Sequence, residues 1–151
     1  MDLILWRHAE AEPGEPDLGR GLTAKGIQQA ERMAAWLDRH LAATTRILSS
    51  PADRAQQTVQ ALKRKFRVLP ELAPGASATS VLVAAGWPDC REPVLVVGHQ
   101  PTLGEVAALL LSGEVASWRV RKGAVWWLAT RDRDGESNVA LKLVISPDFL
   151  G

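Results

Sequence analysis

ILWRHAEAE, residues 4–12, places an arginine and a histidine directly after an apolar run. The run LILW, residues 3–6, is short and uninterrupted, which predicts a strand buried on both faces of a sheet. A strand that ends in a guanidinium and an imidazole brings two anion-binding groups to one place. We therefore ask which residues stand at the ends of the other predicted strands.

The composition is that of an ordinary globular domain. The 151 residues are 46% hydrophobic and 23% charged, so we expect a single domain spanning 1–151. A net charge of +1 argues against a broad surface for nucleic acid or membrane, and the N-terminus has no basic leader. The single cysteine, Cys90, excludes an internal disulfide and is compatible with a reducing compartment. We expect a cytoplasmic protein.

The histidines do not predict a metal site. His8, His40 and His99 lack the close spacing of metal-binding motifs such as HExxH, so we expect neither a metal nor another cofactor. His40 follows Arg39 in the predicted last turn of a helix, where a cation suits the helix dipole.

Strands and helices alternate along the chain. Besides LILW, strands are predicted at RILSS (46–50), RVL (67–69), PVLVVG (93–98), AVWWLAT (124–130) and VALKLVI (139–145). Helices are predicted from the Thr23 cap to about residue 43, from Ser50–Pro51 to about Phe66, from Ser77 or Thr79 to Gly86, and from Pro101 to about Leu111. The first helix has an apolar stripe formed by Ile27, Ala30, Ala34, Leu37 and Leu41. This order predicts an α/β fold, a three-layer sandwich with a mostly parallel central sheet, helices on both faces and a C-terminal antiparallel hairpin.

Three predicted strand ends carry groups that bind anions. Arg7 and His8 follow the first strand, Arg54 follows the second in SSPADRAQQT, and His99 follows the strand 93–98. Ligands of parallel sheets bind beyond the carboxyl ends of the strands, and helix N-termini there add free N–H donors. Each residue alone is more typical of a solvated or structural side chain, but together and in this order they predict a phosphate pocket.

These motifs resemble the histidine phosphatase superfamily, also called phosphoglycerate-mutase-like, and within it the small SixA-type branch of phosphohistidine phosphatases. The matching segments are LWRHAEAE (5–12), DLGRGLTAKG (17–26), SSPADRAQQTV (49–59), LPELAPG (69–75) and VVGHQPTLG (96–104). Ala9 stands where the wider superfamily usually has glycine, which the small branch tolerates.

The resemblance implies a role for each matching residue. His8 is the expected nucleophile that forms a phosphohistidine intermediate, Arg7 and Arg54 clamp the phosphoryl oxygens, and His99 stabilises the transferring group. Arg20 and Asp17 at the rim, and Gln100 beside His99, are expected to bind substrate. A neutral imidazole is a competent nucleophile near pH 7, and the arginine fork matches two phosphoryl oxygens at once. Inorganic phosphate or sulfate should fit the same pocket.

The substrate depends on the leaving group. An ester needs a general acid, whereas phosphohistidine expels an imidazole that needs much less help. Glu71 is that acid in one register of LPELAPG; in the other, with Leu72 as the aligned hydrophobic residue, no acid is present. The branch resemblance favours the second register and a surface position for Glu71. The chain between Arg54 and His99 also leaves little length for a lid.

We therefore expect the substrate to be a phosphohistidine-bearing protein, such as a histidine-phosphotransfer domain of a two-component relay. Two alternatives stay open, a phosphatase of a small phosphomonoester and a non-catalytic phosphate-binding domain. The segment that contains Trp118, Arg119, Arg121 and Lys122 has two interpretations. It is either a docking surface or a packed edge strand with solvated charges, and such patterns are more often the second.

Overall fold

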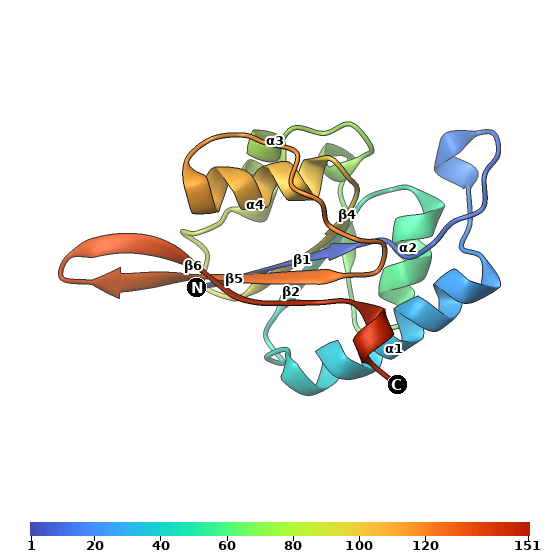
Figure 1. Cartoon of the computed structure of the whole chain (residues 1–151), viewed down its shortest axis with the longest axis horizontal. Helices are drawn as coiled ribbons and strands as arrows, with labels where there is room; N and C mark the ends of the chain where they lie inside the picture. Colours follow the sequence, from blue (N-terminus) through green and yellow to red (C-terminus); the bar gives the residue numbers. More distant parts are fainter.

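A mixed sheet of six strands in the order β3-β2-β4-β1-β5-β6 forms the centre of the computed structural model (Figure 1). The structure describes the backbone of residues 1–151 and every side chain except that of Arg133. The strands are β1 (Asp2–Arg7), β2 (Arg46–Ser49), β3 (Arg67–Val68), β4 (Val94–Gly98), β5 (Val125–Arg133) and β6 (Glu136–Ile145). The first four are parallel, and β5 and β6 add the antiparallel hairpin. The predicted α/β class with its C-terminal hairpin is confirmed.

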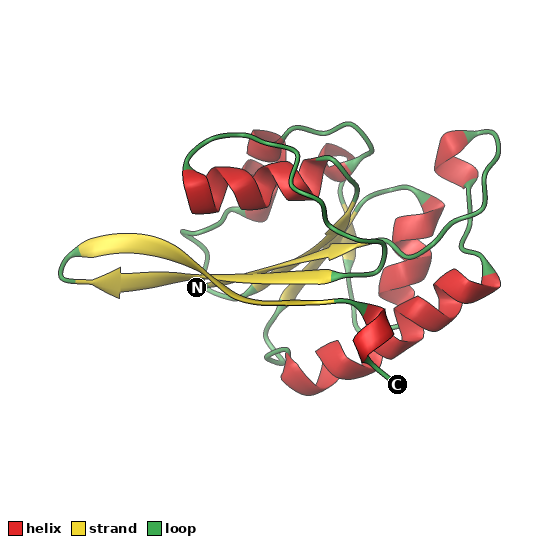
Figure 2. Cartoon of the chain, viewed as in Figure 1, coloured by secondary structure: helices red, strands yellow, loops and turns green.

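Helices cover both faces of the sheet, which makes three layers (Figure 2). They are α1 (Ala24–His40), α2 (Asp53–Gln60), α3 (Ala78–Ala85) and α4 (Thr102–Ser112), with short 3-10 turns η1 (Asp17–Gly19), η2 (Pro70–Leu72) and η3 (Pro147–Phe149). Leu3 and Leu5 of β1 pack in the cluster that contains α3 and α4, whereas Ile4 and Trp6 pack in the cluster that contains α1 and α2. The apolar run LILW is therefore buried on both faces, as its lack of alternation predicted.

Helix boundaries differ from the sequence prediction mainly in α2. Ser50 does not cap this helix; the N-cap is Ala52, and the helix ends at Gln60, six residues before Phe66. The chain turns at Lys63, which takes a positive φ of 57°. Nothing in the residue types before Lys63 breaks a helix, so the periodic pattern suggested a longer one.

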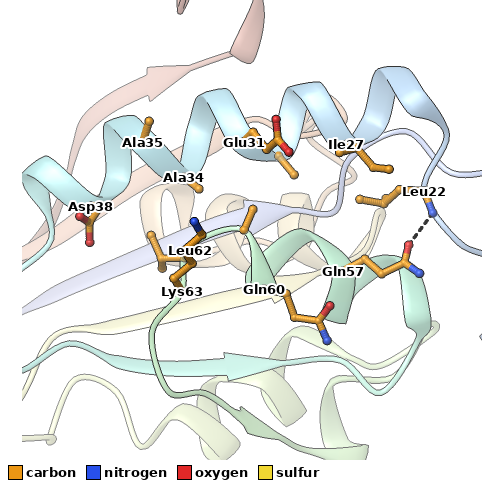
Figure 3. Close-up of a pocket in the computed structure, with 12 residues that line it drawn as sticks. Leu22, Ile27, Glu31, Ala34, Ala35, Asp38, Gln57, Gln60, Leu62 and Lys63 are labelled. Atoms are coloured by element: carbon orange, nitrogen blue, oxygen red, sulfur yellow. Dashed lines mark hydrogen bonds between the residues drawn. The ribbon is translucent and has the colours of Figure 1, made fainter.

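Two other expectations were wrong in detail. Ile27, a member of the predicted apolar stripe, is 48% exposed and lines a groove of about 770 Å³ between α1 and α2 (Figure 3). At one end of that groove Leu22 N–H donates to Gln57 Oε1 over 2.7 Å. Trp118 lies in an irregular loop between α4 and β5, not in an edge strand.

The hairpin is longer than predicted because its strands extend to a tight turn. Asp134 and Gly135 both have positive φ, 53° and 80°, the backbone of a two-residue turn that follows strand twist. No helix among the residues that the structure describes is long and apolar enough to span a bilayer.

Candidate active site

The sheet brings the ends of β1, β2 and β4 together, and these ends carry the predicted site. Arg7 is in register with Gly98, and His8 N–H donates to Gly98 O over 3.1 Å. The rings of His8 and His99 are 5.1 Å apart between centroids. The expected convergence of the strand ends is therefore a feature of the fold.

The ring of His8 is held through one nitrogen, which leaves the other free. Its Nδ1 lies 2.7 Å from the backbone oxygen of Ala9. Because a carbonyl oxygen only accepts, the proton of the neutral ring sits on Nδ1 and the lone pair on Nε2. Burial, and then the cations Arg54 and Arg7, lower the pKa of His8 to about 4 against the opposing Ala9 hydrogen bond. The His8 ring is consequently neutral at pH 7, the protonation state that a nucleophilic imidazole requires, and its role as nucleophile stays a prediction.

His99 is held from the other side by Ser50. Its Nε2 lies 2.7 Å from Ser50 Oγ, which also accepts the Ala52 N–H over 3.1 Å. Its Nδ1 is buried without a partner among the described side chains. Burial, then His8 and Arg54, lower the pKa of His99 to about 3. Because Ser50 Oγ already accepts the Ala52 N–H, we assign its own proton to the bond with Nε2, which places the His99 ring proton on Nδ1.

Two guanidinium groups supply the positive charge. Arg54, 4% exposed, stands in the first turn of α2 and donates to Asp17 through Nη1 to the backbone oxygen and Nη2 to Oδ2. Arg7 donates Nη1 to Val120 O over 2.9 Å, and its buried Nε has no partner among the described residues. Burial, followed by Arg119, lowers the pKa of Arg7. Unused donors of this kind in a buried cationic site fit an oxyanion.

The chain matches the family model "Histidine phosphatase superfamily (branch 1)" over residues 3–77. It is 33% identical over 126 residues to the phosphohistidine phosphatase SixA homolog of Haemophilus influenzae, covering 73% of this chain and 77% of that protein. The chain belongs to the histidine phosphatase superfamily. Phosphohistidine phosphatase SixA of Escherichia coli is 32% identical over 123 residues, 76% of each chain. A structure of SixA complexed with tungstate superposes with a TM-score of 0.79 at 27% identity over 99% of both chains. This histidine phosphatase is therefore of the SixA type.

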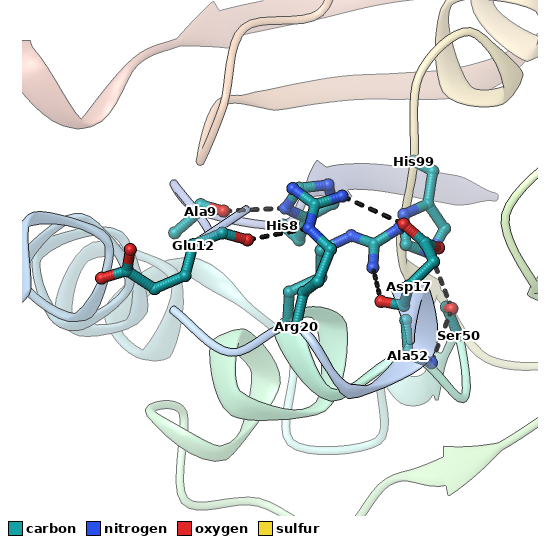
Figure 4. A network of polar contacts seen from close by, with 9 residues as sticks. His8, Ala9, Glu12, Asp17, Arg20, Ser50, Ala52 and His99 are labelled. Atoms are coloured by element: carbon teal, nitrogen blue, oxygen red, sulfur yellow. Dashed lines mark hydrogen bonds and ion pairs between the residues drawn. The ribbon is translucent and has the colours of Figure 1, made fainter. Parts of the chain in front are cut away.

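Arg20 and Asp17 form the rim of the histidine phosphatase site (Figure 4). Arg20 donates Nε to Glu12 O over 2.8 Å and Nη1 to Asp17 Oδ1 over 3.0 Å. The same carboxylate meets Arg54, so hydrogen bonds from Arg20 and Arg54 lower the pKa of Asp17. Asp17 thus holds two guanidinium groups in place, and direct binding of substrate by either rim residue stays a prediction.

Gln100 uses both ends of its amide within the protein. Its Oε1 accepts Gly104 N–H over 2.9 Å, and its Nε2 donates to Trp118 O over 2.8 Å. It anchors the loop between α4 and β5 to α4, and the predicted contact with substrate stays a prediction.

Two residues of the site were given no role from sequence. Ser50 orients His99, and Thr58 accepts the Ala9 N–H over 3.0 Å while donating to Arg54 O over 2.7 Å. Thr58 follows Arg54 by four residues, one helical turn, which was the available signal. Ser50 gave no signal beyond its place at a strand end.

Glu71 lies at the surface, as the second register predicted. It is exposed and lines a depression with Arg46 and Arg67 that includes neither His8 nor His99, whereas its neighbour Leu72 is buried in the core. In the described part of the chain, no group of three or more His, Cys, Asp or Glu is placed to hold a metal ion.

Proposed function

We propose that this histidine phosphatase hydrolyses phosphohistidine on a partner protein, without a metal ion, through a phosphohistidine intermediate on His8. The observation that carries the proposal is the fixed tautomer of His8, whose free Nε2 belongs to the same cluster as Arg7, Arg54 and His99. Phosphoryl transfer asks a protein mainly for position and charge stabilisation, and this cluster supplies both.

Two displacements at phosphorus complete the reaction. In the first, the Nε2 lone pair of His8 attacks phosphorus, the bond to the substrate imidazole breaks, and the departing nitrogen keeps that electron pair. Ala9 O holds the Nδ1 proton of the now phosphorylated ring. In the second, water attacks phosphorus, the bond to His8 breaks with its electron pair returning to Nε2, and the phosphate that leaves carries the protons of the water. Arg7, Arg54 and His99 balance the charge on the phosphoryl oxygens in both steps.

Two observations favour phosphohistidine as the substrate. Glu71 is not placed to act as general acid, and residues 61–93 form part of the core and not a lid over the site. Glu71 is outside the pocket, so an alcohol leaving group has no evident proton donor from LPELAPG. The chain between α2 and β4 forms β3, η2 and α3, and Leu72, Ala78 and Val81 are part of the core. That segment supports the sheet, which favours a phosphate presented on another protein. A histidine-phosphotransfer domain has this chemistry.

The test is phosphate release from a phosphohistidine-bearing histidine-phosphotransfer domain, with p-nitrophenyl phosphate in parallel. We expect His8→Ala to lower both rates by about a thousandfold or more, because the nucleophile is lost. His40→Ala is the matched control, since His40 is exposed and stacks on Trp36 with centroids 4.4 Å apart. EDTA should leave the wild-type rate unchanged.

The outcomes separate the alternatives. If the enzyme hydrolyses only the small ester, its substrate is a small phosphomonoester metabolite and not a phosphohistidine protein. Inactivity on both, with the fold intact and phosphate still bound, would favour a binding domain. Loss of activity in EDTA would contradict metal independence.

A further inference from the structure

A basic pocket adjoins the phosphoryl site. We call Lys25, Arg119, Arg121 and Lys122 the basic rim. With Arg7 these residues line a pocket of about 360 Å³, and Asp148 is the one carboxylate among its described lining residues. The chain as a whole has a net charge of +1, so this concentration of positive charge is local. Arg7 lines this pocket and also acts electrostatically on His8 and His99, so it links the basic pocket to the histidine cluster.

The loop that carries three of these cations is fixed to the backbone of the nucleophile. Gly123 N–H donates to the carbonyl oxygens of Arg7 and His8, both over 3.1 Å, and Arg7 N–H donates to Ala124 O. The side chain of Gln100 donates a hydrogen bond to Trp118 O. The same oxygen packs directly against α4 at Gly104, where a Cβ would lie only 1.7 Å from it. The position of the basic rim relative to His8 is therefore set by the fold and not by a free loop.

The cations of the basic rim have no side-chain partners among the residues whose side chains the structure describes. All four are exposed, and none forms an ion pair or a side-chain hydrogen bond with any residue whose side chain is described. Arg119 stands close enough to Arg7 to disfavour its charge. Like charges grouped in this way repel one another, and an anion that docks there relieves the repulsion.

We propose that the basic rim binds carboxylates next to the phosphohistidine of the protein substrate, so that the enzyme selects phosphohistidines on acidic surfaces. This inference rests on the proposed function and adds the chemistry of the partner. Guanidinium forks pair with carboxylates bidentately, and such pairs at the edge of an interface mainly raise the rate of productive encounter.

The test compares two synthetic phosphohistidine peptides that differ only in flanking residues, glutamates in one and lysines in the other. In about 50 mM salt we expect wild-type kcat/KM to be at least about tenfold higher for the glutamate peptide, and the ratio to shrink in about 500 mM salt. Arg121→Glu with Lys122→Glu should abolish the preference. Arg39→Glu with Lys65→Glu changes net charge equally at exposed positions outside the pocket and should preserve it.

Hydrolysis of p-nitrophenyl phosphate monitors the catalytic residues and should change less than about threefold in both double variants. Equal wild-type kcat/KM for the two peptides, or a preference that survives in the Arg121/Lys122 variant, overturns this inference alone. Failure of the wild type on both peptides while it hydrolyses p-nitrophenyl phosphate overturns the proposed function, and this inference with it.

Discussion

His8 and His99 are each held by a single hydrogen bond to one ring nitrogen. Ala9 O fixes the proton of His8 on Nδ1, and Ser50 Oγ occupies Nε2 of His99. Each bond leaves the other nitrogen of its ring unused. In the proposed mechanism the two rings therefore take opposite roles, His8 as nucleophile and His99 as hydrogen-bond donor.

Removing the Ser50 hydroxyl should impair catalysis without removing a group that touches substrate. In Ser50→Ala, His99 loses the bond that selects its tautomer, so we expect kcat for the phosphoprotein to fall by about 10- to 100-fold, with a smaller change in KM. The Ala52 N–H also loses its acceptor, which costs about 1–2 kcal/mol of unfolding free energy. Nitrogen NMR shifts of the His99 ring should reveal a mixture of tautomers.

Ser49→Ala is the matched control for that experiment. Ser49 is equally buried, and its hydroxyl donates to the Ser50 carbonyl over 2.9 Å without contacting His99. Its kcat should stay within about threefold of wild type. If Ser50→Ala behaved like Ser49→Ala and kept a single His99 tautomer, Ser50 would have no positioning role.

At the scale of elements, the segment after β1 is held between two helices. Ala9 N–H donates to Thr58 on α2, Glu10 N–H donates to Gln29 on α1, and Glu10 O accepts the N–H of Thr23, the cap of α1. The nucleophile thus depends on how closely α1 approaches residues 8–12.

Gly26 allows that approach, and Gly26→Ala should disturb it. A Cβ at Gly26 would lie 2.0 Å from Glu10 O, so either α1 or the segment after His8 must move. Alanine in place of glycine usually stabilises a helix, but here we expect the clash to lower the unfolding free energy by about 1–3 kcal/mol. We also expect kcat/KM to fall by about tenfold or more. Urea unfolding and phosphate release measure the two effects.

Gly19→Ala is the corresponding control near the rim. A Cβ there would meet Pro16 at 3.5 Å, an ordinary contact, so stability and activity should stay close to wild type. Equal stability and activity of the Gly26 and Gly19 variants would show that α1 can accommodate a Cβ against Glu10 O without disturbing the site.

The sequence predicted the elements and the meeting of their ends better than it predicted how each side chain is held. Apolar runs and caps located β1, β4, α1 and α3, and parallel order then implied that Arg7, His8, Arg54 and His99 meet. The pairs Arg54–Asp17 and His99–Ser50 join residues 37 and 49 positions apart, and no local pattern encodes them. The early end of α2 depends on the turn at Lys63, again without a sequence signal.

At the scale of the whole molecule, the neutral histidines make stability depend on pH. The pKa values of His8 and His99, about 4 and about 3, lie below the value of about 6.5 expected in the unfolded chain. Between these values the unfolded state binds more protons, so stability rises with pH across this window and falls as pH drops from 7 to 5. The loss is of the order of 2 kcal/mol for each histidine.

Denaturant unfolding at pH 7 and pH 5 measures this dependence, and inorganic phosphate should reduce it. A bound anion stabilises the folded state and favours the charged form of both rings. His8→Ala should remove about half of the pH effect, because only His99 then resists protonation. Stability that stayed flat between pH 7 and pH 5 would mean that the two rings are not kept neutral by the fold.

The tryptophans have a consequence for how docking can be observed. Trp6, Trp87 and Trp127 are buried at 7% exposure or less, whereas Trp118 is half-buried, directly precedes Arg119, and lies 6.3 Å from Trp126 between ring centroids. Carboxylates that settle on the basic rim should change the electric field at this indole pair more than at the buried indoles of Trp87 and Trp127. Intrinsic emission of the unlabelled enzyme should therefore report the arrival of an acidic partner, even in a His8→Ala protein that cannot take up its phosphoryl group.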